Sequence, residues 1–125
     1  MQKQEPKRIL AVVEDLFFSV KLTDAAKRAG LALEFVKDSK PVLEKALEKP
    51  SLIILDLNFE AARPLSLIAK LKGNPATKGI SLLGYVSHVQ GELKQKAHEA
   101  GCDMVLARSA FSQNLPQIFR RHSGL

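Results

Sequence analysis

The sequence predicts an α/β fold, a doubly wound five-stranded parallel sheet with strand order 2-1-3-4-5 and helices on both faces. The first observation is that short apolar runs alternate five times with helical patterns. The second is that these runs are continuous, as expected for strands buried on both faces. The third is the length of 125 residues, which suits a single domain over residues 1–125.

The first half of the chain supplies three strands and two helices. Residues 9–13 form an apolar run rich in β-branched side chains, and residues 31–36 and 52–55 form two more apolar runs. Between them, residues 16–29 place apolar side chains on one helical face and end before a glycine. Residues 39–47 begin with a serine suited to capping and a proline suited to a first turn, so a second helix is expected there.

The second half of the chain completes the pattern. Residues 64–72 and 92–100 carry apolar side chains at spacings of three and four, which predicts two helices. Residues 81–86 and 104–107 are the remaining apolar runs, and we expect them to be strands. An asparagine and a proline are expected to open the last helix, over residues 114–119.

Composition limits the classes of function. Hydrophobic residues make up 46% of the chain and charged residues 26%, the mixture of a water-soluble domain. The start of the chain is polar and no apolar run has the length of a membrane span, so we expect a cytoplasmic protein. The net charge of +6 fits either a plain basic surface or attraction to an acidic protein or to nucleic acid. No block of like charges or helix-turn-helix pattern indicates nucleic-acid binding.

Candidate site residues stand where the expected strands end. Because ligands of doubly wound sheets bind at the carboxyl ends of the strands, these positions are the candidates for a site. They are Glu14 and Asp15 after the first strand, Asp56 after the third, Val86 and Ser87 at the fourth, and Arg108 after the fifth. The three carboxylates would repel one another without a cation, and oxygen ligands suit Mg²⁺. Alternatively, each acid merely complements the dipole of a following helix.

In order and spacing, these segments resemble the receiver domains of bacterial response regulators over the whole chain. Residues 9–15 resemble the first strand with its closing acidic pair, and residues 51–57 the third strand with its phosphoacceptor aspartate. Residues 80–101 fit the fourth strand and helix of the family without a gap. The resemblance implies a CheY-like flavodoxin-type fold and transfer of a phosphoryl group from a histidine kinase to Asp56. It also implies weak Mg²⁺ binding by Glu14, Asp15 and Asp56.

The chain departs from the family pattern on the side that responds to the phosphoryl group. Val86 stands where the family has a hydroxyl residue, and Ser87 where it has a small one. Val105 replaces the reporting aromatic residue, and Arg108 replaces the lysine. If the acidic pocket is closed to Mg²⁺, Arg108 is the expected filler, paired with Asp56 in place of a bound cation. His88, just past the fourth strand, is a further side chain within reach of the site.

These departures favour one interpretation and leave an alternative. The favoured one is an atypical receiver, not an enzyme, that acts in two-component signalling by binding a histidine kinase or another signalling protein. The alternative is a receiver that still accepts a phosphoryl group on Asp56. A flavin- or nucleotide-binding domain is not expected, because no glycine-rich loop follows the first strand.

Overall fold

A computed structural model describes residues 6–87 and 90–124. Its five strands are β1 (Arg8–Val12), β2 (Ala32–Phe35), β3 (Leu52–Asp56), β4 (Ser81–Val86) and β5 (Met104–Ala107). The helices are α1 (Leu16–Ala29), α2 (Ser39–Ala46), α3 (Pro64–Lys72), α4 (Gly91–Ala100) and α5 (Arg108–Arg121), with a 3₁₀ turn, η1 (Glu60–Ala62), before α3. The expected alternation of strands and helices is confirmed.

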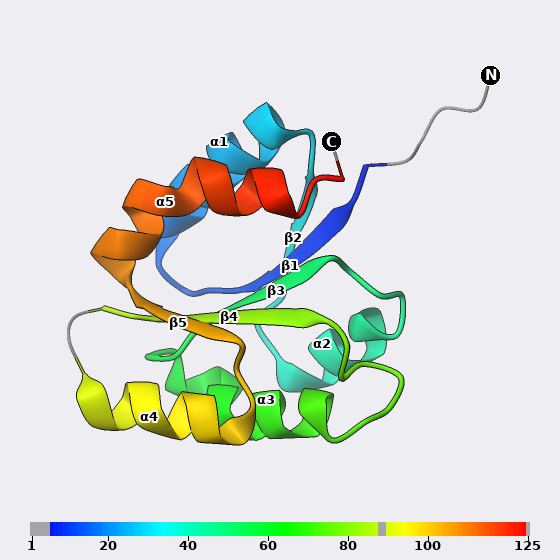
Figure 1. Cartoon of the computed structure of the whole chain (residues 1–125), viewed down its shortest axis with the longest axis vertical. Helices are drawn as coiled ribbons and strands as arrows, with labels where there is room; N and C mark the ends of the chain where they lie inside the picture. The colour runs from blue at the N-terminus through cyan, green and yellow to red at the C-terminus, as the bar shows by residue number, and fades with distance from the viewer. Residues whose placement is uncertain (1–5, 88–89, 125) are drawn as a thin grey trace.

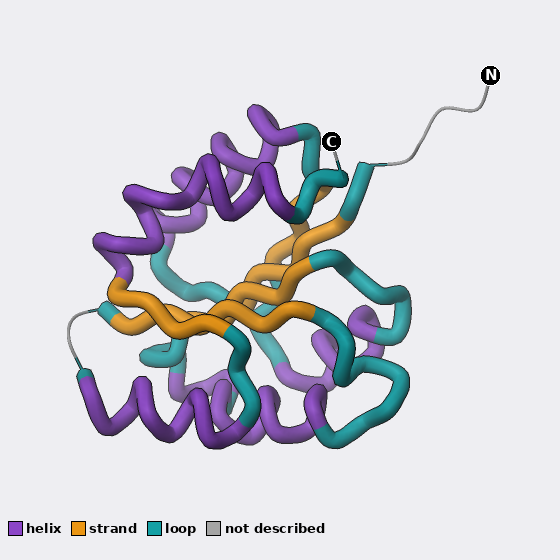
Figure 2. Tube along the Cα trace, in the orientation of Figure 1, coloured by secondary structure: helices purple, strands orange, loops and turns teal. Residues whose placement is uncertain are grey.

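The sheet is parallel, with strand order β2-β1-β3-β4-β5, as the sequence predicts. Helices α1 and α5 cover one face, and α2, α3 and α4 cover the other (Figure 1). The tube in Figure 2 shows the resulting three layers, with the strands in the middle. Strand ends that lie far apart in sequence therefore meet at one edge, at the left of both views.

Two separate cores hold the layers together. Alternate residues of each strand point to opposite faces, so Ile9 and Ala11 pack under α1 and α5, whereas Leu10 and Val12 pack over α2, α3 and α4. On the α1–α5 side, Phe111 is fully buried. It stacks against Phe18 at a centroid distance of 5.4 Å.

Two expectations about helix boundaries were wrong. Helix α5 begins at Arg108 and encloses Pro116, instead of beginning at Asn114. The polar residues around Phe111 are typical of a loop, but burial of Phe111 against α1 stabilises the additional helical turns before Asn114. Helix α2 is preceded by Asp38 as its N-cap, so Ser39 is the first helical residue. No helix in the described part of the chain is long and apolar enough to cross a membrane.

Candidate functional site

The candidate site lies at the carboxyl edge of the sheet. Asp56 is the last residue of β3, and Asp15 follows β1, which is the neighbour of β3. Arg108 is the first residue of α5, directly after β5. The order of the strands thus brings an acid from each of two central strands toward a cation from the edge strand.

Asp15 has a structural role at this edge. Its Oδ1 accepts hydrogen bonds from the backbone amides of Phe17 at 3.0 Å and Phe18 at 3.2 Å, which caps α1. Its Oδ2 accepts a hydrogen bond from Nη1 of Arg108 and forms an ion pair with it. Both oxygens of Asp15 are therefore engaged within the protein.

The ion pair corrects an expectation from the sequence. Arg108 does bind a carboxylate of the acidic trio, but its partner is Asp15 and not Asp56. Asp15 stands beside the start of α1, and Arg108 starts α5, two helices packed together on one face of the sheet. Asp56 has no ion-pair partner among the described residues.

Asp56 lies in a half-buried position with few donors. Burial raises the pKa of its carboxyl group, and the neighbouring charges of Asp15 and Glu14 raise that pKa further. The backbone amide of Asn58, which donates to Oδ1 of Asp56 at 2.9 Å, opposes this rise. The charges of both other acids therefore act on Asp56, which is less exposed than Glu14.

The raised pKa of Asp56 predicts a pH-dependent effect of Asp56→Asn. The folded protein keeps the Asp56 proton at pH values where the unfolded chain has released it, so ionisation of Asp56 destabilises the fold as the pH rises. We expect Asp56→Asn to unfold at a higher urea concentration than the wild type at pH 7. The difference should vanish below the ordinary aspartate pKa of about 3.9.

The control for this prediction is Asp38→Asn. Asp38 is exposed and makes no side-chain capping bond, so its replacement should leave the urea midpoint nearly unchanged at every pH. A wild type as stable as Asp56→Asn at pH 7 would show that ionised Asp56 carries no penalty.

Asn58 connects the loops that follow β3 and β4. Its side-chain Oδ1 accepts a hydrogen bond from the backbone amide of Ser87 at 2.8 Å. Its Nδ2 donates to Oε1 of Gln90 at 2.9 Å. The segment that follows β4 is therefore fastened on both sides of residues 88–89 to the loop that carries Asp56. His88 itself lies outside the described residues.

Tyr85 places a hydroxyl group beneath the acidic residues. It pairs with Asp56 in the β3–β4 register and is 1% exposed. Its ring packs against Phe18 and Phe111, at centroid distances of 4.8 and 5.6 Å. The hydroxyl has no hydrogen-bond partner of normal geometry among the described residues. Burial and then the charges of Asp56 and Asp15 raise the pKa of Tyr85, so the group is a neutral donor at physiological pH.

The unpartnered hydroxyl predicts that Tyr85→Phe stabilises the free protein. Leaving a buried polar group unpaired costs about 1 kcal/mol or more, and phenylalanine keeps the ring contacts. We expect the unfolding free energy at pH 7 to rise by about 1 kcal/mol in urea titrations. A loss of stability would mean that the hydroxyl forms a hydrogen bond in solution.

The residues present do not form a metal site in this arrangement. No group of three His, Cys, Asp or Glu side chains that could hold a metal ion occurs within residues 6–87 and 90–124. Glu14 is exposed, and Asp15 gives one oxygen to the cap of α1 and the other to Arg108. The guanidinium group supplies the positive charge that the sequence analysis expected from Mg²⁺.

The two switch positions, Val86 on β4 and Val105 on β5, carry no polar side chain. Val86 and Val105 are buried in the core beneath α3 and α4, at the positions where the family has a hydroxyl and an aromatic residue. Asn58, Gln90 and Tyr85 are the residues of this edge that the sequence analysis did not select. Asn58, two residues after Asp56, is a turn-forming signal in the sequence. Its hydrogen-bond partner Gln90, 32 residues away, cannot be predicted from that signal.

Comparison with known proteins identifies the fold. No family model matches the sequence. No curated protein matches it either. Solved structures do match the chain. One is a response regulator from Hahella chejuensis, with 20% sequence identity and a TM-score of 0.83, and the match covers 95% of this chain and 96% of that one. The chemotaxis response regulator CheY4 of Vibrio cholerae is similar too, with 20% sequence identity and a TM-score of 0.78, and the match covers 93% of this chain and 98% of that one.

A third similar structure is the manganese-bound form of the response regulator Rcp1 (21% identity, TM-score 0.72, 93% and 91% coverage). Together with the strand order and the acids at the carboxyl edge, these structures define the class of fold. This chain has the receiver fold of response regulators, as the sequence resemblance predicts.

Proposed function

We propose that the chain is an atypical receiver module of two-component signalling, which binds a partner protein through a surface of fixed form. The partner is a histidine kinase or another signalling protein, and the module works in the cytoplasm without enzymatic activity of its own. The observation that carries this proposal is the fastening of the β4–α4 connection by Asn58.

A receiver switches when a bound phosphoryl group gains contacts in one conformation that it lacks in another. In this chain, the groups that would move are already engaged within the protein. The amide of Ser87 donates to Asn58, and the guanidinium of Arg108 donates to Asp15. Val86 has no donor to offer a phosphoryl oxygen. A phosphoryl group on Asp56 would therefore gain few contacts in one conformation that it lacks in the other.

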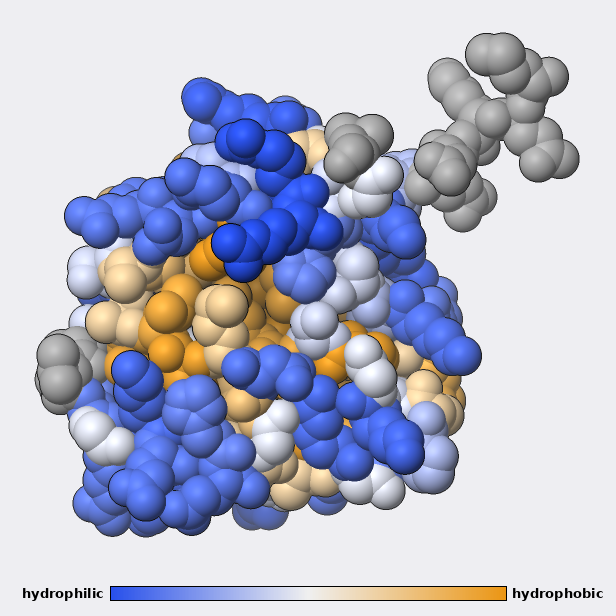
Figure 3. Space-filling model, viewed as in Figure 1, coloured by the Kyte–Doolittle hydropathy of each residue, from blue (hydrophilic) through white to orange (hydrophobic). Residues whose placement is uncertain are grey.

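The edge strand offers a surface for a partner. Figure 3 shows hydrophobic side chains gathered over β5, between α4 and α5. Met104 on this strand is 37% exposed. Apolar surface beside an unpaired strand edge is typical of a protein-binding site, and here it is present without any modification of the chain.

A second candidate is a receiver that accepts a phosphoryl group on Asp56. The half-buried carboxylate at the end of β3 favours it, since only one of its oxygens accepts a hydrogen bond from a described backbone amide. In that case, Asp56 would be the phosphoacceptor, and Mg²⁺ would have to displace Arg108 from Asp15 to join Glu14 and Asp56.

Hydrogen exchange in the presence of beryllofluoride and Mg²⁺ tests the proposal. We expect amide protection in α4, β5 and α5 to be the same with and without the reagent. The control is Asp56→Asn, which cannot bind beryllofluoride. A protection change in these elements that Asp56→Asn abolishes would establish the second candidate and overturn the first.

A further inference from the structure

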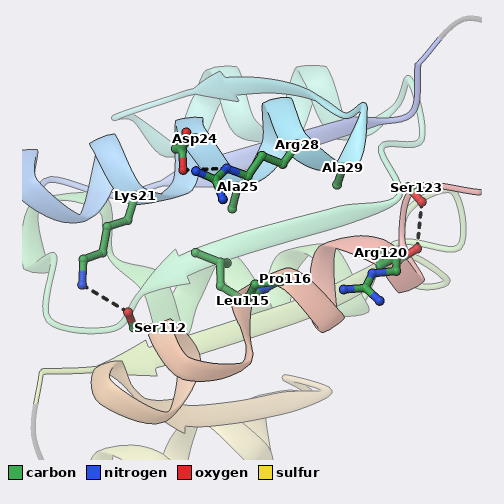
Figure 4. A pocket seen from close by; sticks show the side chains of 10 residues that line it. All are labelled: Lys21, Asp24, Ala25, Arg28, Ala29, Ser112, Leu115, Pro116, Arg120 and Ser123. Atoms are coloured by element: carbon green, nitrogen blue, oxygen red, sulfur yellow. Dashed lines mark hydrogen bonds and ion pairs between the residues drawn. The ribbon is translucent and has the colours of Figure 1, made fainter.

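A groove of about 580 Å³ runs between α1 and α5, on the face of the sheet that carries both helices. Figure 4 shows its walls: Lys21, Asp24 and Arg28 project from α1, and Leu115, Pro116 and Arg120 from α5. Nothing in the proposed signalling mechanism uses this groove.

The groove combines an apolar floor with a positively charged rim. Ala25, Ala29, Leu115 and Pro116 supply the apolar part, and Lys21, Arg28 and Arg120 supply the cations. The only acid in the lining, Asp24, already pairs with Arg28 at 3.2 Å. Lys21 donates to the neutral hydroxyl of Ser112 at 3.3 Å. Neither Lys21 nor Arg120 has an acidic partner within the described residues.

The apolar character continues beyond the groove along α1. Residues three or four apart lie on one face of a helix, and Phe17 is four residues before Lys21. Phe17 therefore lies on the same face of α1 as Lys21, Asp24 and Arg28, and it adds an apolar side chain at the end of this stripe. It is 86% exposed, although a phenylalanine side chain favours burial.

The shape of this surface selects an elongated occupant. From Phe17 to Arg28 the stripe follows α1 for about 17 Å, at 1.5 Å per residue. A small anion would contact one cation and leave Phe17 exposed. An α-helix lying along the groove would cover the apolar floor and Phe17 and meet all three cations. In helix-in-groove binding, an amphipathic helix lays its apolar face into a hydrophobic groove.

We propose that the α1–α5 groove binds an acidic amphipathic helix of a partner protein. Its apolar face lies on Phe17, Ala25 and Pro116, and its carboxylates pair with Lys21 and Arg120. The inference rests on the proposed signalling role, because it adds a second partner surface to the β5 edge and names the chemistry of the partner that binds there. The net charge of +6 agrees with an acidic partner and opposes pairing of this groove with a second copy of the chain.

The test uses a designed helical peptide of glutamate, alanine and leucine, as long as α1, with leucines at spacings of three and four. A peptide of the same composition in scrambled order keeps the charge but loses the apolar stripe. Binding is followed by fluorescence anisotropy and by amide shifts in NMR spectra. We expect the patterned peptide to shift amides of α1 and α5 and to bind more tightly than the scrambled one.

Matched variants separate the groove from general charge attraction. Lys21→Glu with Arg120→Glu should weaken binding about tenfold or more. Lys27→Glu with Arg121→Glu changes the net charge equally on the same two helices, outside the groove lining, and should change affinity less than twofold. Phe17→Ser should weaken binding of the patterned peptide and leave the scrambled one unaffected.

Three results would overturn the inference: equal affinity for both peptides, equal losses in both charge-reversal pairs, or binding to vesicles of anionic phospholipid but not to the peptide. Circular dichroism of each variant checks that it is folded. None of these results alters the hydrogen-exchange response to beryllofluoride, so failure of the groove and failure of the proposed signalling role are distinguishable.

Discussion

Replacing Arg108 with alanine is expected to raise the affinity of the protein for Mg²⁺ about tenfold or more. In the wild type, the guanidinium of Arg108 holds Oδ2 of Asp15. Removing it frees that oxygen and leaves Glu14, Asp15 and Asp56 without an ion-pair partner among residues 6–87 and 90–124, so their mutual repulsion favours a divalent ion. The measurement is a Mg²⁺ titration followed by amide shifts near residues 14, 15 and 56.

Arg121→Ala is the matched control for this prediction. It removes one positive charge from the same helix, 13 residues after Arg108, where Arg121 forms no ion pair with a described residue. Its Mg²⁺ affinity should stay within about twofold of the wild type, because an exposed distant charge is screened. If Arg108→Ala bound Mg²⁺ no better than Arg121→Ala, then Arg108 would not be competing for the site.

The second large effect is expected from Val86→Thr combined with Arg108→Lys. The threonine supplies a hydroxyl donor at a β4 position where valine has none, and the lysine supplies a compact cation that does not form the forked contact of arginine. We expect beryllofluoride with Mg²⁺ to change amide protection in α4 and β5 about tenfold or more, since the hydroxyl now gains a contact only when the ligand is bound. Hydrogen exchange measures this change.

Val86→Ala combined with Arg108→Lys is the control that isolates the hydroxyl. It changes the cation in the same way and leaves position 86 without a donor, so its protection should not respond to beryllofluoride. A response in this control would assign the effect to the lysine alone. A response already present in the wild type would refute the view that the switch is degraded.

The sequence predicted the strands and their order, because these depend on local composition. Continuous apolar runs such as Leu52–Leu55 have few alternatives to a strand buried on both faces. Right-handed connections then leave few ways to order five of them. The carboxyl edge followed from that order, so Asp15, Asp56 and Arg108 were placed at one edge without knowledge of any side-chain contact.

What the sequence did not predict depends on contacts between distant segments. The choice of Asp15 over Asp56 as the partner of Arg108 depends on side-chain geometry within a few ångströms. The bonds from Asn58 to Ser87 and Gln90 link two loops, and neither loop specifies the other. The early start of α5 depends on the burial of Phe111, which offsets a helix interior that contains Pro116.

The ion pair between Asp15 and Arg108 makes the two halves of the α1–α5 layer thermodynamically linked. Arg108 is the first residue of α5, where a positive charge is unfavourable beside the positive end of the helix dipole. A ligand that draws Asp15 away therefore exposes α5 to this cost and loosens the wall of the groove that α5 supplies. Reciprocity requires that an occupant which holds α5 against α1 weakens such a ligand by the same factor.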